Sequence, residues 1–172
     1  MDEQHDWVQR VTIAKDVIAQ IEAERYFAKG GSYVRISEED NYNGSVKENF
    51  EKIKNCKVCA LGGCFLSIVR FKNNVNFDEI TDIGAGQFVN NSKFKQILTS
   101  IFPAQQLVLI ENAFENGGWG EAPIFGSDDE KYSVSKQDKR EAWEFGQKFS
   151  NQNDRLIAIM QNIIDNKGTF KP

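Results

Sequence analysis

The residues with the clearest chemical potential in this chain are three cysteines, Cys56, Cys59 and Cys64. Cys56 and Cys59 have the Cys-x-x-Cys spacing of a zinc knuckle, and structural zinc takes about four nitrogen or sulfur ligands. His5 is the only histidine, so a zinc site would need His5 to fold back onto all three thiols. The second ligand pair of most zinc modules is absent. We therefore expect no cofactor, with zinc as the alternative.

A redox pair is a second interpretation of Cys56 and Cys59. Redox pairs of this spacing sit at the exposed start of a helix that follows a strand, where the helix dipole lowers a thiol pKa. No parallel-sheet pattern surrounds this pair. We therefore favour a third interpretation, in which the thiols are small buried hydrophobes beside Gly62 and Gly63 that let another helix approach closely. Residues 56–71 are apolar nearly all round, which predicts one buried helix.

The chain has few of the residues that other catalytic patterns need. A single histidine disfavours a Ser-His-Asp or Cys-His arrangement. The acidic runs at 38–40 and 128–130 are typical of solvated loops, but they keep a metal-dependent or carboxylate-based hydrolase as an alternative function. A calcium loop starting at residue 39 fails because Phe50 stands where the bidentate glutamate is needed. Gly84 and Gly86 are followed by no third glycine, and there is no Gly-Lys-Ser/Thr, so phosphate loops are disfavoured.

Composition describes one ordinary acidic domain. The chain has 172 residues with a net charge of -4 and a pI near 5.2, which makes nucleic acid an improbable partner. An acidic nucleic-acid mimic remains an alternative, although the charge is modest for it. The start MDEQHDW does not resemble a secretory signal, no run reaches the roughly 18 apolar residues of a membrane span, and the odd cysteine count favours a reducing compartment. We expect a cytoplasmic protein without a membrane partner.

Hydrophobic spacing predicts a mainly α, single-domain helical bundle over 1–172, with six to seven helices and at most a small β element. We expect residues 1–5 and 170–172 to be frayed. In the first helix, Trp7, Val11, Ala14, Ile18 and Ile21 form the predicted buried stripe. The predicted helices cover 6–28, 45–54, 56–71, the segment after Asn91, the segment after Pro103, 136–150 and 153–167, with one extended segment inside 30–37.

Residues 117–135 are predicted to form a long irregular loop. The loop combines four glycines and an acidic triplet with large apolar side chains, and such loops are usually held against the body of the protein or a partner. An exposed tryptophan there could anchor an interface, or it could instead pack the loop onto the helices. The candidate partner-binding residues are Trp119, Phe125, Asp128, Asp129 and Glu130.

The run Cys59-Ala60-Leu61-Gly62-Gly63, followed by Phe65-Leu66, resembles a set of uncharacterised bacterial and phage proteins with a Cys-Ala-Leu-Gly-Ala/Gly core motif. The closing RLIAIMQNIIDNKGTF is also similar to those proteins. The resemblance implies helices on either side of the motif and brings no known activity. It favours an accessory factor of a phage or mobile element.

Together these patterns predict a binding or regulatory protein and not an enzyme. We expect it to bind either a host protein, through the acidic surface and the 117–135 loop, or a small anionic ligand in an interhelical pocket. The oligomeric state is left open.

Overall fold

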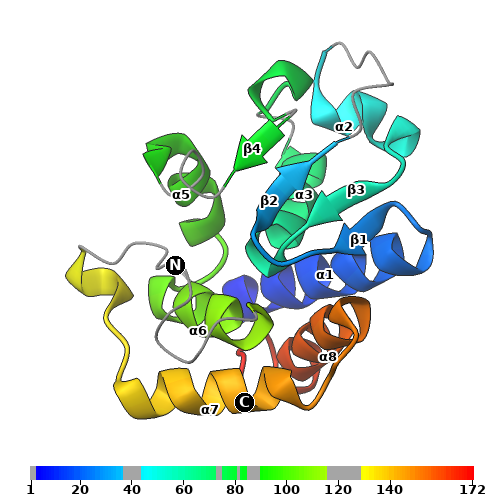
Figure 1. The fold of residues 1–172 in the computed structure, drawn as a ribbon. Helices are drawn as coiled ribbons and strands as arrows, with labels where there is room; N and C mark the ends of the chain where they lie inside the picture. Colours follow the sequence, from blue (N-terminus) through cyan, green and yellow to red (C-terminus); the bar gives the residue numbers. More distant parts are fainter. Residues whose placement is uncertain (1–2, 37–43, 73–74, 81, 85–89, 116–128) are drawn as a thin grey trace.

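The protein is mainly α-helical with a small β element, as predicted. The computed structural model describes residues 3–36, 44–72, 75–80, 82–84, 90–115 and 129–172, of which 3–5 and 82–84 are described by their backbone alone. Among the described residues, no helix is both long enough and apolar enough to span a bilayer. The α-helices in this part of the chain are α1 (Glu3–Glu22), α2 (Val46–Asn49), α3 (Ala60–Lys72), α5 (Ser92–Thr99), α6 (Ala104–Phe114), α7 (Lys136–Gln147) and α8 (Gln152–Asp165) (Figure 1).

Four short strands form one sheet in the order β1-β3-β2-β4. β3 is parallel to β1 and antiparallel to β2, and β2 is antiparallel to β4. The sequence indicated only the extended segment that contains β2, because strands of three or four residues are too short to show an alternating pattern. The strands are β1 (Tyr26–Ala28), β2 (Ser32–Arg35), β3 (Cys56–Val58) and β4 (Asp82–Gly84).

The prediction of one helix over 56–71 is wrong at its start. Cys56 to Val58 form β3, and the helix begins at Ala60. Lys57 is exposed between two buried neighbours, which is the alternation of a half-buried strand. The Cys-x-x-Cys segment therefore lies where a strand is followed by a helix, an arrangement that the sequence did not reveal.

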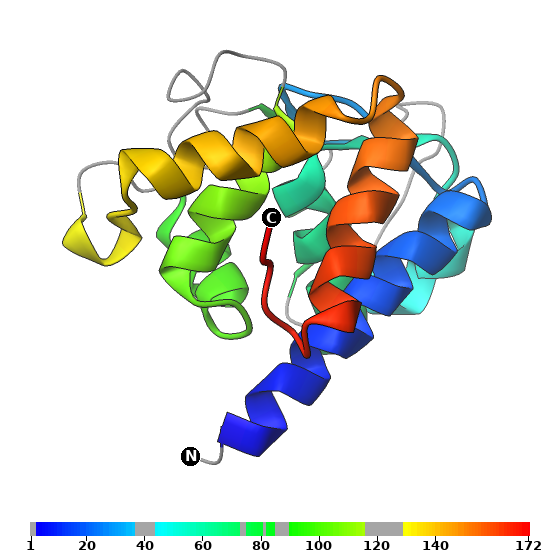
Figure 2. The ribbon, with the colours of Figure 1, turned by 90° about the horizontal axis from the view of Figure 1, so that it is seen from below.

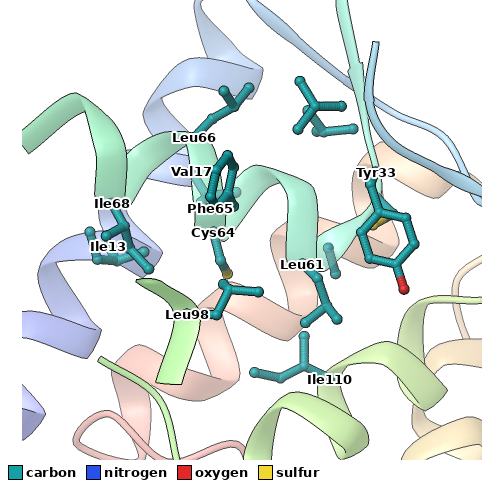
Figure 3. Close-up of a cluster of buried hydrophobic side chains, with 14 of the residues drawn as sticks. Ile13, Val17, Tyr33, Leu61, Cys64, Phe65, Leu66, Ile68, Leu98 and Ile110 are labelled. Carbon is teal, nitrogen blue, oxygen red and sulfur yellow. The ribbon is translucent and has the colours of Figure 1, made fainter. Parts of the chain in front are cut away.

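Helix α3 is the centre of the core, as its apolar composition predicted. Every residue from Ala60 to Val69 is buried. Figure 3 shows α3 side chains meeting those of α1 and α5, with Tyr33 of β2 at one side of the cluster. A Cβ at Gly62 would lie 1.5 Å from the backbone oxygen of Tyr33. The expected close approach is therefore real, but the neighbour is a strand and not a helix.

Only part of the apolar stripe predicted for α1 is buried. Trp7, Val11 and Ile18 are half-buried, whereas Ala14 and Ile21 are buried as expected. The reason is that α1 packs against both α3 and α8, so its apolar residues divide between two contact faces. The buried hydrophobic residues of α1 are Ile13, Ala14, Val17 and Ile21.

Two predicted helix starts are confirmed by their caps. Ser45 accepts a hydrogen bond from the Glu48 N–H at the start of α2, and Asn91 accepts one from the Phe94 N–H at the start of α5. Both side chains satisfy a backbone donor that has no partner inside its helix. Each capping hydrogen bond joins residues three positions apart, so the residue types that make it can be recognised in the sequence.

The expectation of a frayed C-terminus at 170–172 is wrong. Phe170 is buried, and its N–H donates to Gln106 of α6 at 2.6 Å. Lys171 bonds through its N–H and its carbonyl oxygen to Asn162 of α8. Figure 2 shows the final residues running between α6 and α8. At the other end, helix α1 already begins at Glu3.

Candidate functional site

The three thiols are buried and free, as the packing interpretation predicted. Cys56 and Cys64 are 0% exposed and Cys59 is 2% exposed. Burial raises the pKa of Cys56 and of Cys64 to about 12. Figure 3 shows Cys64 pointing into the hydrophobic cluster near Leu98. The thiolate is the nucleophilic form of cysteine, and a raised pKa keeps these thiols protonated at neutral pH, so we expect them to react slowly.

Cys59 has a structural task at the start of α3. Its backbone N–H donates to the Ser32 oxygen at 2.6 Å, and its sulfur accepts the Gly62 N–H at 3.4 Å. Cys59 thus caps the helix in the way a serine would, with a weaker acceptor. Burial raises the pKa of its thiol well above the usual value, and the nearby carboxylate of Glu115 raises it further.

The residues proposed for zinc do not converge in the described part of the chain. No three or more His, Cys, Asp or Glu side chains among those residues are placed so that they could hold a metal ion. His5 lies in the first turn of α1, and its side chain is outside the described residues.

Burial predicts the reactivity of the thiols. In the native protein at mildly alkaline pH, a disulfide reagent should modify Cys56, Cys59 and Cys64 more than about 100-fold more slowly than in the urea-unfolded chain, because thiolate formation and access are both suppressed. Absorbance of the released chromophore gives both rates. A native thiol that reacts at the unfolded rate would contradict this packing.

Buried polar side chains surround the Cys59 end of α3. The Tyr33 hydroxyl donates to Glu111 Oε1 at 2.6 Å, and Glu111 is 3% exposed. Burial, followed by the adjacent Glu111 carboxylate, raises the pKa of Tyr33 far above its usual value. The phenol therefore stays protonated and acts as a fixed donor that ties β2 to α6.

Glu115 makes a second connection between the sheet and the helices. Its Oε2 accepts the Gly31 N–H at 3.1 Å in the turn between β1 and β2, where Gly31 has a φ of 75°. Burial raises the pKa of Glu115, and the Gly31 N–H and the Arg155 guanidinium partly offset that rise. Side chains of α8 bond to the same turn and to the end of β1, since Gln152 accepts the Gly30 N–H and Asn153 accepts the Ala28 N–H. These contacts position the turn and stabilise the fold.

The residues predicted to bind a partner are mostly outside the described part of the chain. Trp119, Phe125 and Asp128 lie there, in 116–128. Asp129 and Glu130 are exposed. Asp129 caps the short 3-10 helix Glu130–Tyr132 by accepting the Lys131 N–H, and it pairs with the Lys131 ammonium at 3.2 Å. The backbone N–H of Lys131, followed by its ammonium, holds the pKa of Asp129 below its usual value.

An apolar groove of about 250 Å³ lies between α1 and α3 at the turn that follows α5. Ile13, Ile68 and Ile101 form its floor and are 4%, 1% and 7% exposed. Figure 3 shows Ile13 and Ile68 side by side at the edge of the core cluster. Val8 and Phe71 form its sides and are the large hydrophobic side chains with the highest exposure in the described residues, at 46% and 47%. Gln9, Thr12 and Lys72 complete the lining.

The Phe71 side of the groove contacts a cation from its own helix, Arg70. The Arg70 guanidinium lies 5.5 Å from the centre of the Phe71 ring and 4.7 Å from that of Phe50. Arg70 is itself fixed by an ion pair with the buried Asp16 of α1. A cation stacked on an aromatic ring limits its motion. The groove is therefore pre-formed at this wall, which is the usual condition of small-molecule sites.

Sequence reasoning missed both the groove and the buried carboxylates. Phe71 and Lys72 end an otherwise buried helix, and Val8 falls outside the predicted stripe of α1. These are weak signals, because isolated exposed hydrophobic residues are common on protein surfaces. Glu111 lies in the last turn of the apolar helix α6 and Glu115 directly follows its end, so their spacing of four residues could have suggested a common side of the helix.

No protein-family model, curated protein or solved structure matches this chain.

Proposed function

We propose that this is a non-enzymatic binding protein that takes a small molecule with a mainly apolar body into the groove between α1 and α3. The observation that carries the proposal is the groove itself, where three buried isoleucines and two half-exposed apolar side chains face one concave space. Apolar side chains left facing water at one place favour a ligand that covers them.

The size of the groove limits the ligand. Its volume of about 250 Å³ exceeds the roughly 150 Å³ of a cavity that holds benzene, and it falls just below the range of sites for drug-sized molecules. A ligand with one ring or a short alkyl chain fits these bounds. Gln9 in the lining offers an amide to a polar end, and the Thr12 hydroxyl, which donates to the Val8 oxygen at 2.8 Å, can still accept a hydrogen bond.

The test is binding of 1-octanol, measured by ligand-observed NMR and calorimetry. The wild-type protein should bind it, and Thr12→Trp should reduce the affinity by about ten-fold or more, because an indole grown from the exposed rim fills the groove without altering the core.

Ala19→Trp is the matched control, since Ala19 is exposed on the same helix and does not line the groove. It should bind octanol like the wild type. Failure of the wild type to bind, or equal loss in both variants, would remove the groove as the binding site.

A further inference from the structure

We infer that the molecule bound in the groove is a monocarboxylate, whose apolar body covers the three isoleucines and whose carboxylate pairs with Lys72. This inference rests on the proposed function, because it names the class of ligand for the same groove. The observation that supports it is one cation, Lys72, in the lining of a mainly apolar groove.

Lys72 is the only charged side chain among the residues that line the groove in the described part of the chain. It is the last residue of α3, directly after the Phe71 wall. Lysine is a compact point charge with three donors, so it can pair with a carboxylate while it keeps another bond. The site thus has an apolar floor and a single positive rim, which complements an amphipathic anion.

The Lys72 ammonium is oriented by a neighbour. Its Nζ donates to Ser100 Oγ at 3.2 Å, and the Ser100 hydroxyl donates in turn to the Ile97 oxygen at 2.7 Å. Ser100 precedes Ile101 of the groove floor, so this contact holds the long lysine side chain beside the groove. Because the lysine side chain is already held in place, less conformational entropy is lost when it pairs with a ligand.

The charge of the site favours one negative charge over two. A single exposed lysine can neutralise a monoanion, whereas a phosphate monoester would leave charge uncompensated against apolar walls. A second cation nearby, Arg10, already donates to the Gly168 oxygen at 2.7 Å and to the Ile101 oxygen at 3.5 Å.

The experiment compares octanoate with 1-octanol at low ionic strength, by calorimetry on the full chain. Octanoate should bind about two- to five-fold more tightly, which is the range of an exposed ion pair, and the difference should shrink as salt is added. Lys72→Gln should make the two ligands equal, and Lys72→Glu should make octanol the better ligand. Lys136→Gln, the same charge change on an exposed residue of α7, should leave the preference unchanged.

The outcomes separate this inference from the proposed function. If octanol and octanoate bind equally to the wild type, or if Lys72→Gln keeps the octanoate preference, the carboxylate assignment is wrong while the groove remains a binding site. If octyl phosphate binds more tightly than octanoate, the ligand class is wrong. If neither octanol nor octanoate binds, both proposals fail together.

Discussion

Replacing Gly62 with alanine is expected to destabilise the protein by about 3 kcal/mol or more, and to leave little soluble folded material at growth temperature. The added Cβ would lie 1.5 Å from the Tyr33 oxygen and 2.5 Å from its carbonyl carbon. Both are backbone atoms of β2, so no side-chain rotation relieves the overlap. Helix α3 would have to move away from the sheet and open the centre of the core.

Gly63→Ala is the matched control for that substitution. A Cβ at Gly63 would meet side-chain atoms of Val17 and Val58 at 3.6 Å, which is ordinary van der Waals contact. Alanine also has a helix propensity about 1 kcal/mol better than glycine. Urea unfolding followed by circular dichroism should show Gly63→Ala as stable as the wild type or slightly more stable. Equal losses for the two variants would contradict the close contact at Gly62.

The glycine pair illustrates what the sequence could and could not predict. Two adjacent small residues in an apolar helix indicate a close approach, and that prediction holds. Only the fold tells Gly62 from Gly63, because the contact is made by Tyr33, far away in the chain. The order of β3 before α3 was hidden for a related reason, since a buried strand of three residues reads like the first turn of the buried helix that follows it.

Features that depend on residues close in sequence were predicted more successfully than features that join distant residues. The caps Ser45 and Asn91 were predictable because each bonds to a residue three positions away. The groove was not, because it joins residues near positions 10, 70 and 101, and its floor looks like ordinary core in each segment taken alone. Burial of Glu111 was equally hidden, because its partner is the Tyr33 hydroxyl of β2.

Arg155 carries the second large effect, and Arg155→Ala should cost about 3 to 5 kcal/mol of unfolding free energy. The side chain is 3% exposed. Its Nη1 donates to the Phe114 oxygen at 2.9 Å, and its Nε and Nη2 donate to the Phe149 oxygen at 3.1 and 2.8 Å. One guanidinium thus joins the last residue of α6 to the segment between α7 and α8. Its removal leaves both carbonyl groups short of donors and withdraws the positive charge that favours the buried Glu115 carboxylate.

Two further variants test whether the fork of donors causes that effect. Arg155→Lys keeps the charge but cannot reproduce the planar fork that reaches both carbonyl groups, so it should recover only part of the loss. Arg140→Ala, at an exposed residue paired with Glu144 one turn along α7, should change stability by less than about 0.5 kcal/mol. Urea unfolding of the three variants gives the comparison. If Arg155→Ala were as mild as Arg140→Ala, the joint between α6 and the α7–α8 connection would depend on apolar packing alone, and the buried guanidinium would have no stabilising role.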